Sequence, residues 1–193
     1  LAALARTGSC ANPNELDFRL LTWNSFGAAQ SALSFLRWRG VPDAHRFDHP
    51  TVHAVAARAD VFCMQEVYLS EAERFFDGLG HGAKLRDSNA TRFWPLSFGG
   101  SGLGVASRLS IARHGKRAFS PPYLSAERFA RKGMLHARVR VGDQQIDVVN
   151  THMQSGMGLA SHVIRKSQLD ELRRFIDDVG SSGVPMVVYG DFN

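Results

Sequence analysis

The sequence has little cysteine, no internal repeat and no long hydrophobic run. Cys10 and Cys63 are its two cysteines, so a framework of several disulfides is excluded. Cys63 stands in the apolar run "VFCMQ" and is expected to be a buried thiol. We do not expect it to pair with Cys10, which leaves the redox compartment open. No segment is apolar for long enough to span a bilayer.

Acidic residues are fewer than basic ones. The 193 residues include 18 Asp and Glu against 23 Lys and Arg, which gives a net charge of +5. A positive excess favours partners that carry phosphate, although a solvated basic surface gives the same count. The hydrophobic content of 44% and charged content of 21% are typical of a soluble globular protein. The length fits one domain, which we expect to be a monomer.

The N-terminal segment "LAALARTGSC" resembles the end of an export signal, although Arg6 interrupts its apolar stretch. It predicts an exported protein, secreted or periplasmic. Residues 1–16 are therefore expected to form a leader, and residues 17–193 the folded domain.

Apolar periodicity and turn residues predict a mixture of strands and helices. The longest predicted helix, 162–180, has an apolar face of Leu169, Leu172, Phe175, Ile176 and Val179. A short "GDQ" turn joins two of the strands into a hairpin. Stacked sheets with helices outside accommodate this mixture. The predicted strands are 17–24, 60–67, 103–108, 134–141, 145–153 and 185–190, and the other helices are 50–59 and 70–80.

Polar side chains stand at or near the ends of these predicted strands: Asn24, Glu66, Asn150, His152, Asp191 and Asn193. Strands that run side by side bring such ends to one edge of a sheet. Each residue alone also has a structural explanation, such as a turn cap or an ion pair. Together they predict a site.

Oxygen ligands without cysteine suit a hard cation such as Mg²⁺. Glu66 can bind the ion, and Asn24 can supply a neutral oxygen or orient Glu66. His152 can donate to a phosphate oxygen, and Asp191 can orient an attacking water.

The segments "LLTWN", "DVFCMQEV", "SGLGVASR", "VVNTHMQ" and "YGDFN" resemble, in order and spacing, the endonuclease/exonuclease/phosphatase superfamily from residue 17 onward. The resemblance implies an α/β fold, a four-layer α-β-β-α sandwich of two mixed sheets flanked by helices, and a phosphodiesterase that depends on Mg²⁺ or Mn²⁺. It implies Asn24 and Glu66 as metal ligands, and His152, Asp191 and Asn193 as catalytic residues. Lys132 and Asn150 are the expected substrate-binding residues.

The family pattern continues past "GDFN" to a later His. The resemblance thus implies that the last strands and the final His motif are missing, and that residues 1–193 alone are inactive.

Three further segments resemble the neutral sphingomyelinase branch: "SGLGVASRLSI", "ARKGML" with Lys132, and "NTHMQSG" followed by "RKSQLDELRRFI". They imply cleavage of a phospholipid headgroup diester of the sphingomyelin type, with a membrane lipid as partner. The alternative is a nuclease, in which a basic surface with Arg37, Trp38 and Arg39 holds DNA or RNA. The lipid reaction is favoured because the Lys-Gly step and the Arg-x-x-Gln-Leu segment discriminate better than charge does, and because the basic residues are scattered along the chain.

Other patterns are expected to be structural. Pro50 interrupts the spacing of His45, His49 and His53, so these are interpreted as loop histidines and not as a metal site. The stretch "GGSGLG" lacks the Lys-Ser/Thr ending of a phosphate loop and is expected to be a turn. The loop aromatics of 93–98 and 119–123 are expected to fill the core, with membrane docking as the alternative.

Overall fold

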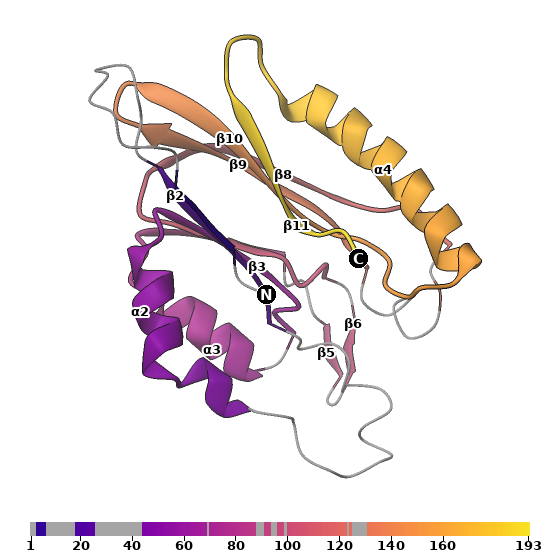
Figure 1. Cartoon of the computed structure of the whole chain (residues 1–193), viewed down its shortest axis with the longest axis horizontal. Coiled ribbons are helices and arrows are strands. Elements are labelled where there is room, and N and C mark those ends of the chain that lie inside the picture. Colours follow the sequence, from indigo (N-terminus) through magenta and orange to yellow (C-terminus); the bar gives the residue numbers. More distant parts are fainter. Residues whose placement is uncertain are drawn as a thin grey trace.

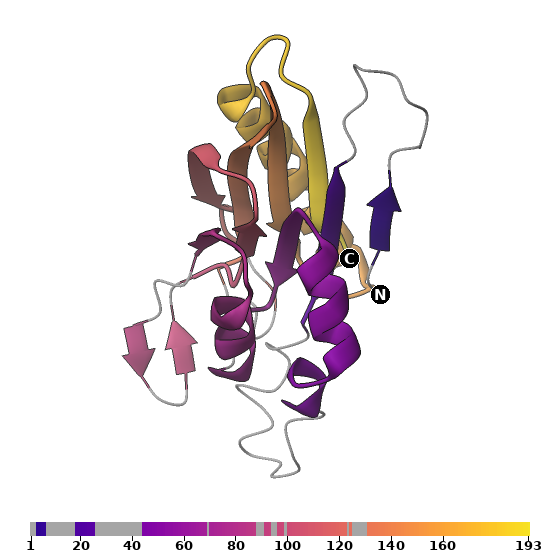
Figure 2. The same ribbon diagram turned by 90° about the vertical axis from the view of Figure 1, so that its left-hand side faces the viewer.

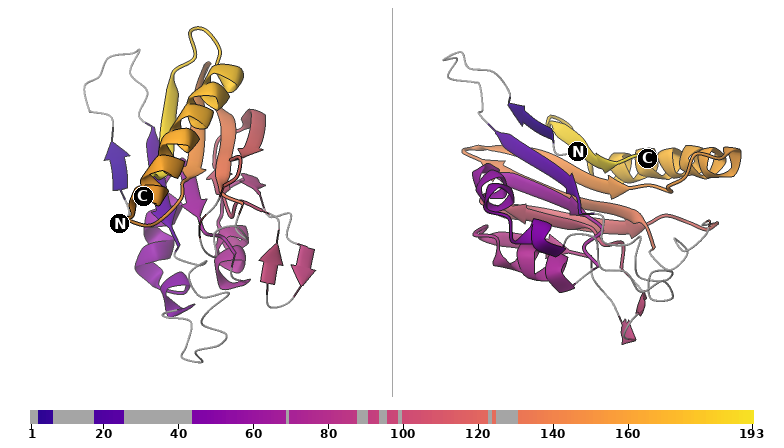
Figure 3. Two further views of the ribbon diagram at one scale, coloured as in Figure 1. Left: turned by 90° about the vertical axis from the view of Figure 1, so that its right-hand side faces the viewer. Right: turned by 60° about the horizontal axis from the view of Figure 1, so that its bottom comes forward.

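The chain folds into two β-sheets stacked face to face between helices (Figure 1). The computed structural model describes residues 3–6, 18–25, 44–68, 70–87, 91–93, 96–98, 100–122, 124 and 131–193. From one side to the other, the layers are a pair of helices, the first sheet, the second sheet and one long helix (Figure 3).

The first sheet has the strand order β1-β2-β3-β7-β4. Strands β2 and β3 are parallel and place Asn24 opposite Gln65, whereas the other pairs are antiparallel. Figure 2 shows β1 beside β2 at the edge of this sheet. The strands are β1 (Ala3–Arg6), β2 (Arg19–Asn24), β3 (Val61–Gln65), β4 (Ala83–Arg86) and β7 (Gly104–Ser107).

The second sheet has the strand order β11-β10-β9-β8. Strands β10 and β11 are parallel and place His152 opposite Asp191, and β9 and β10 form the predicted hairpin. The strands are β8 (Ile111–Ala118), β9 (Gly133–Val141), β10 (Gln144–His152) and β11 (Met186–Asp191). A separate ribbon pairs β5 (Thr91–Phe93) with β6 (Leu96–Phe98).

Helices cover the outer face of each sheet. The short 3₁₀ helix η1 (Ala44–Phe47) leads to α2 (Pro50–Arg58), which with α3 (Ser70–Gly78) lies on the first sheet. The long helix α4 (Leu159–Val179) lies on the second sheet. Within the part of the chain that the structure describes, no helix is both long and apolar enough to cross a membrane.

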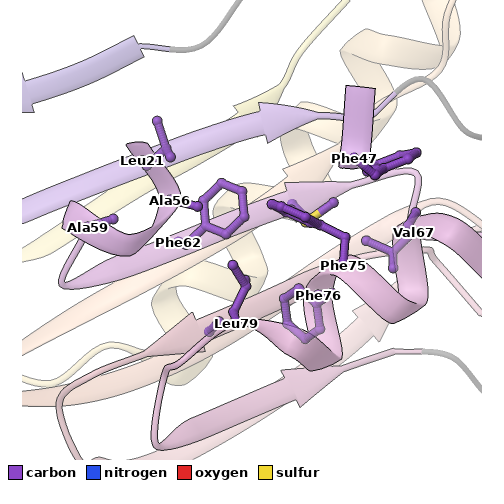
Figure 4. Close-up of a cluster of buried hydrophobic side chains, with 12 residues drawn as sticks. Leu21, Phe47, Ala56, Ala59, Phe62, Val67, Phe75, Phe76 and Leu79 are labelled. Atoms are coloured by element: carbon purple, nitrogen blue, oxygen red, sulfur yellow. The ribbon is translucent and has the colours of Figure 1, made fainter. Parts of the chain in front are cut away.

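Alternation along the strands fills the three spaces between the layers. On β3, Phe62 and Met64 face the helices α2 and α3, where they join a cluster that includes Phe75 and Phe76 (Figure 4). Val61 and Cys63 face the second sheet instead. This two-residue period is what a strand buried on both faces requires. Burial raises the pKa of the Cys63 thiol to about 12.

The four-layer architecture confirms the predicted fold, and three local features differ from the predictions. Strand β1 pairs residues 3–6 with the sheet, although this segment was expected to belong to a leader. Helix α4 starts at Leu159, and Leu169 on its predicted apolar face is 48% exposed. The strands β4 and β8 were not predicted, because "AKLR" and "IARHGKRA" are rich in polar residues: β4 is half-buried along its length, and β8 is mostly exposed.

Some predictions concern segments outside the described residues. These include Cys10 and the basic group Arg37, Trp38 and Arg39. Of the loop aromatics, Phe119 is buried beside Phe175 under α4, as expected for a core residue.

Candidate active site

Four predicted site residues lie together at the ends of β2, β3, β10 and β11: Asn24, Glu66, His152 and Asp191. The C mark in Figure 1 stands at the end of β11. Asn24 links two carboxylates, because its Nδ2 lies 2.7 Å from Asp191 Oδ2 and 3.3 Å from Glu66 Oε1. His152 Nε2 lies 3.8 Å from Glu66 Oε1 and 3.9 Å from Asp191 Oδ2. Four residues far apart in the sequence thus surround one small volume.

Glu66 has a strained backbone. Its φ of 61° lies in the left-handed region, which costs a residue with a side chain about 1–2 kcal/mol. Its carbonyl accepts hydrogen bonds from the Tyr68 N–H at 2.8 Å and from the Ser25 hydroxyl at 3.0 Å. These contacts hold a conformation that directs the buried carboxylate out of the end of β3. Sequence reasoning missed Ser25, which carries no pattern beyond following "TWN".

Asp191 and Asn193 are placed by a glycine. Gly190 has a φ of 142°, and a Cβ there would lie 1.9 Å from the Thr151 carbonyl oxygen. Only glycine therefore allows β11 to approach β10 so closely. Beyond it, the Asn193 N–H donates to Asp191 Oδ1 at 3.0 Å, and Asn193 Nδ2 donates to the Met153 carbonyl at 3.0 Å.

These contacts also set the charge of Asp191. Burial raises its pKa, but the hydrogen bonds from the Asn24 side chain and the Asn193 backbone outweigh burial. The net effect is a pKa below the usual range, so the carboxylate is ionised at neutral pH.

Lys132 is buried against His152. Its Nζ lies 2.9 Å from His152 Nε2 and 2.5 Å from the Met153 carbonyl oxygen. An ammonium group only donates, so His152 Nε2 is the acceptor. Burial, followed by the charge of Lys132, lowers the pKa of His152 to about 3. In this arrangement His152 is neutral and orients Lys132, whereas the sequence predicted it as a donor to phosphate.

Asn150 does not reach the site. It is fully buried between the sheets, where its Nδ2 donates to the carbonyls of Met64 at 2.8 Å and Gly104 at 3.0 Å. Its Oδ1 accepts from Gln65 Nε2 at 2.6 Å. Because the amide is occupied by the first sheet, this position does not support the predicted contact with substrate. Asn150 connects the two sheets instead.

A family model for the endonuclease/exonuclease/phosphatase family matches residues 21–193, nearly the whole described domain. The chain belongs to this family. The match covers every residue of the site described above.

Solved structures share the fold of this family member at low sequence identity. Sphingomyelinase C from Streptomyces griseocarneus superposes with a TM-score of 0.72 at 19% identity and covers 90% of this chain and 63% of its own. A beta toxin mutant from Staphylococcus aureus with bound magnesium ions superposes with a TM-score of 0.71 at 14% identity. The alignment covers 90% of this chain and 64% of the toxin chain. TDP2 from D. rerio with a single-strand DNA product superposes with a TM-score of 0.62 at 14% identity. The alignment covers 91% of this chain and 60% of the TDP2 chain.

The chain spans less than two thirds of the length of each of these three structures. A comparison with curated proteins finds no significant match. The likeness to these structures therefore establishes the fold, and the reaction has to be argued from the site.

The site of this family member fits a hard cation. Within the described ranges, no three His, Cys, Asp or Glu side chains are grouped to hold a metal ion among themselves. Mg²⁺ does not need such a cage, because it keeps several waters and is held by one or two carboxylates. Glu66 offers a carboxylate at a strained strand end, with the Asn24 amide 3.3 Å away. These are oxygen-bearing groups of the type that Mg²⁺ prefers.

The histidines of "HRFDHPTVH" serve the helix next to them. His49 Nδ1 accepts from the Thr51 N–H at 3.3 Å and caps α2. His53 Nε2 lies 2.7 Å from the Phe47 carbonyl, and its ring packs against Phe75. His53 lies within α2 and not in a loop, which differs from the sequence interpretation, and the interpretation that these histidines do not bind metal stays a prediction.

The loop after His152 is held by the Arg-x-x-Gln pair of α4. Arg165 Nη1 donates to the carbonyls of Gln154 at 2.9 Å and Gly156 at 2.7 Å. Gln168 Oε1 accepts from the Gln154 N–H at 2.8 Å. The motif that resembles the sphingomyelinase branch thus fixes the segment that leads out of the site. Sequence reasoning named Arg165 and Gln168 but not their partner Gln154.

Proposed function

We propose that the protein is a Mg²⁺-dependent phosphodiesterase that cleaves the headgroup diester of a phospholipid, with sphingomyelin as the first candidate substrate. The observation that supports it best is the linked set Glu66–Asn24–Asp191. In this set one amide joins a strained acid, suited to a cation, to an ionised acid suited to a water. A phosphodiester needs both groups within a few ångströms of the phosphorus.

In the proposed reaction, water attacks phosphorus in line with the leaving alcohol. A P–O bond to the water oxygen forms, and the P–O bond to the alcohol, ceramide for sphingomyelin, breaks. The water loses one proton, and the leaving oxygen gains one and departs as the alcohol. Asp191 orients the water and accepts its hydrogen bond. A cation held by Glu66 and Asn24 would neutralise negative charge on the phosphoryl oxygens.

Lys132 supplies the fixed positive charge of the site. Its ammonium is oriented by His152 Nε2 and by the Met153 carbonyl. We propose that it contacts a phosphate oxygen of the substrate. Because it is buried, its attraction for an anion is screened less than that of a surface lysine. Asn193 Nδ2 donates to the same carbonyl, and we propose that Asn193 contacts the transferred group.

Two findings support a lipid over a nucleic acid. Residues of the sphingomyelinase-like segments, Lys132 and the Arg165–Gln168 pair, make contacts at or next to the site. One of the structures reported above is a sphingomyelinase. Cleavage of DNA or RNA is the second candidate, which the TDP2 structure with its DNA product favours. Export stays a prediction from the N-terminal sequence.

The test compares substrates on the natural full-length protein. Sphingomyelin vesicles, phosphatidylcholine vesicles and single-stranded DNA are incubated with Mg²⁺ and with excess chelator, and Glu66→Gln serves as the inactive control. We expect phosphocholine release from sphingomyelin that stops on chelation. Faster cleavage of DNA would establish the nuclease, and full activity in chelator would refute the metal requirement.

A further inference from the structure

Large exposed apolar side chains gather in the segment just after the site. Met157 is 102% exposed, Leu159 80% and Val163 59%. They span the end of the loop that follows His152 and the first turn and a half of α4. A surface of this kind is expensive in water, so it calls for an explanation.

The segment is held in place. Arg165 binds two carbonyls of the loop, at Gln154 and Gly156, and Gln168 binds the Gln154 N–H. Gly156 has a φ of 101°, and a Cβ there would lie 2.8 Å from Ser161 Oγ, so the turn is tightly packed. The exposure of the apolar side chains is therefore built into the fold.

The charge of α4 changes along its length. Residues 157–169 contain no Asp or Glu and carry His162, Arg165 and Lys166, whereas residues 170–179 contain several acids. Lys166 follows Leu159 and Val163 at helical spacing, on the side opposite the buried Ile164. The outward strip of the first turns is thus apolar and cationic, and that of the last turns is mixed in charge.

This strip adjoins the site. The loop begins at Met153, whose carbonyl accepts from both Lys132 Nζ and Asn193 Nδ2. Figure 1 shows the start of α4 and the C-terminal end of β11 at the same end of the molecule. A flat partner that covers the strip would lie at the entrance to the site.

We propose that Met157, Leu159, Val163 and Lys166 form a docking face for a phospholipid surface, which brings the diester to the site. The proposal rests on the lipid substrate proposed above. Apolar side chains enter the boundary between headgroups and acyl chains, and a lysine reaches the phosphates. The absence of acids on this strip avoids repulsion from anionic lipid.

The first experiment measures binding to vesicles without any catalysis. The natural full-length protein, in chelator, is sedimented with vesicles of phosphatidylcholine and sphingomyelin, with and without phosphatidylglycerol. We expect Met157→Ser/Leu159→Ser/Val163→Ser to lower the partition coefficient about tenfold or more. Lys166→Gln should lower it about fivefold on the anionic vesicles alone. Leu169→Ser, which removes an exposed apolar residue at the far end of the acid-free stretch and next to Asp170, is the comparison variant and should lower the partition coefficient much less than the triple variant does.

Equal binding by the triple variant and the wild type would overturn the proposal. So would protection of Met157 from peroxide oxidation in the absence of vesicles, because another part of the protein or a second copy would then cover the face. We expect Met157 to oxidise readily in solution and to be protected by vesicles.

A second readout separates this face from the reaction. On a water-soluble phosphocholine diester the triple variant should turn over as the wild type does, while it loses rate on vesicles. If the protein binds vesicles through the face but releases no phosphocholine, the proposed reaction fails and the docking face stands. If it cleaves sphingomyelin and the variant keeps its full rate on vesicles, the face fails and the reaction stands.

Discussion

Two polar clusters of similar composition lie on opposite faces of the second sheet. Between this sheet and α4, Asp147 accepts from Arg138 Nε and Nη2 and from His136 Nε2, each at 2.7 Å. On the other face, Glu66 and Asp191 share one amide, and His152 stays 3.8 Å or more from both. Each cluster contains an acid, a histidine and a cation.

The difference lies in how completely the charges are matched. Burial raises the pKa of Asp147, but the hydrogen bonds from Arg138 and His136 outweigh it and leave the pKa below the usual range. The cluster is closed, and its backbone is regular. The site has a strained residue, Glu66, and His152 lies beyond hydrogen-bond distance of both carboxylates. We infer that the closed cluster serves stability and the open one serves catalysis.

The largest effect should come from the open cluster. Glu66→Gln should lower kcat by about 10³-fold, or roughly 4 kcal/mol, because it removes the carboxylate but keeps the shape. Its melting temperature should stay close to that of the wild type. Initial rates in Mg²⁺ and thermal unfolding check this on the natural full-length protein. Glu71→Gln on α3 is the matched control, and a variant that keeps its rate would remove Glu66 from the site.

Arg138→Met should have the opposite profile. It leaves Asp147 buried without its main partner, which costs about 3–5 kcal/mol of unfolding free energy. The rate per folded molecule should not change. Urea unfolding and initial rates of the natural full-length protein provide the measurements. The control is Arg117→Met, which breaks the exposed 2.8 Å pair with Asp178 and should cost no more than about 1 kcal/mol. Equal losses for both would show that the buried cluster does not stabilise the fold.

Asn150→Ala tests whether Asn150 connects the two sheets or contacts the substrate. The Met64 and Gly104 carbonyls lose their donor and stay buried, so unfolding free energy should fall by about 1–3 kcal/mol. KM should not change, since Asn150 does not touch the site. Gln144→Ala on the same strand, which is exposed, is the control. A rise in KM with normal stability would restore Asn150 as a substrate-binding residue.

The smallest expected effect is the change in unfolding free energy at acidic pH. Burial lowers the pKa of His136, so the unfolded chain binds more protons than the folded one once the pH falls below about 6.5. Stability is therefore full above this pH and declines as the pH falls toward the folded pKa. His136→Gln keeps a donor near Asp147 but does not titrate, so the decline above about pH 4 should be weaker. Unfolding free energies from pH 7 to pH 4 measure the slope, and an unchanged slope would contradict this role.

Much of the fold and of the candidate site could be predicted from the sequence, and specific parts could not. Strand-end residues such as Asn24 and Asp191 could be placed because parallel strands bring their ends together. The position of Asn150 could not be predicted, since alternation along β10 does not show which polar residue lies inside the sheet and which lies at its edge. The exposure of Leu169 was missed because Gln168 and Glu171 are buried in its stead, through contacts with Gln154 and Ser120 that are distant in sequence. Strand β8 lacked the apolar pattern that a core strand shows.

The amide of Asn150 crosses from one sheet to the other, and the site takes its residues from both. Neither half of the sandwich contains the constellation by itself. A collapsed chain with both sheets formed but not yet docked in register would have native-like secondary structure and no site. Catalytic competence in this fold thus requires that the two sheets are docked in register, and the activity reports on the fraction of molecules in which they are.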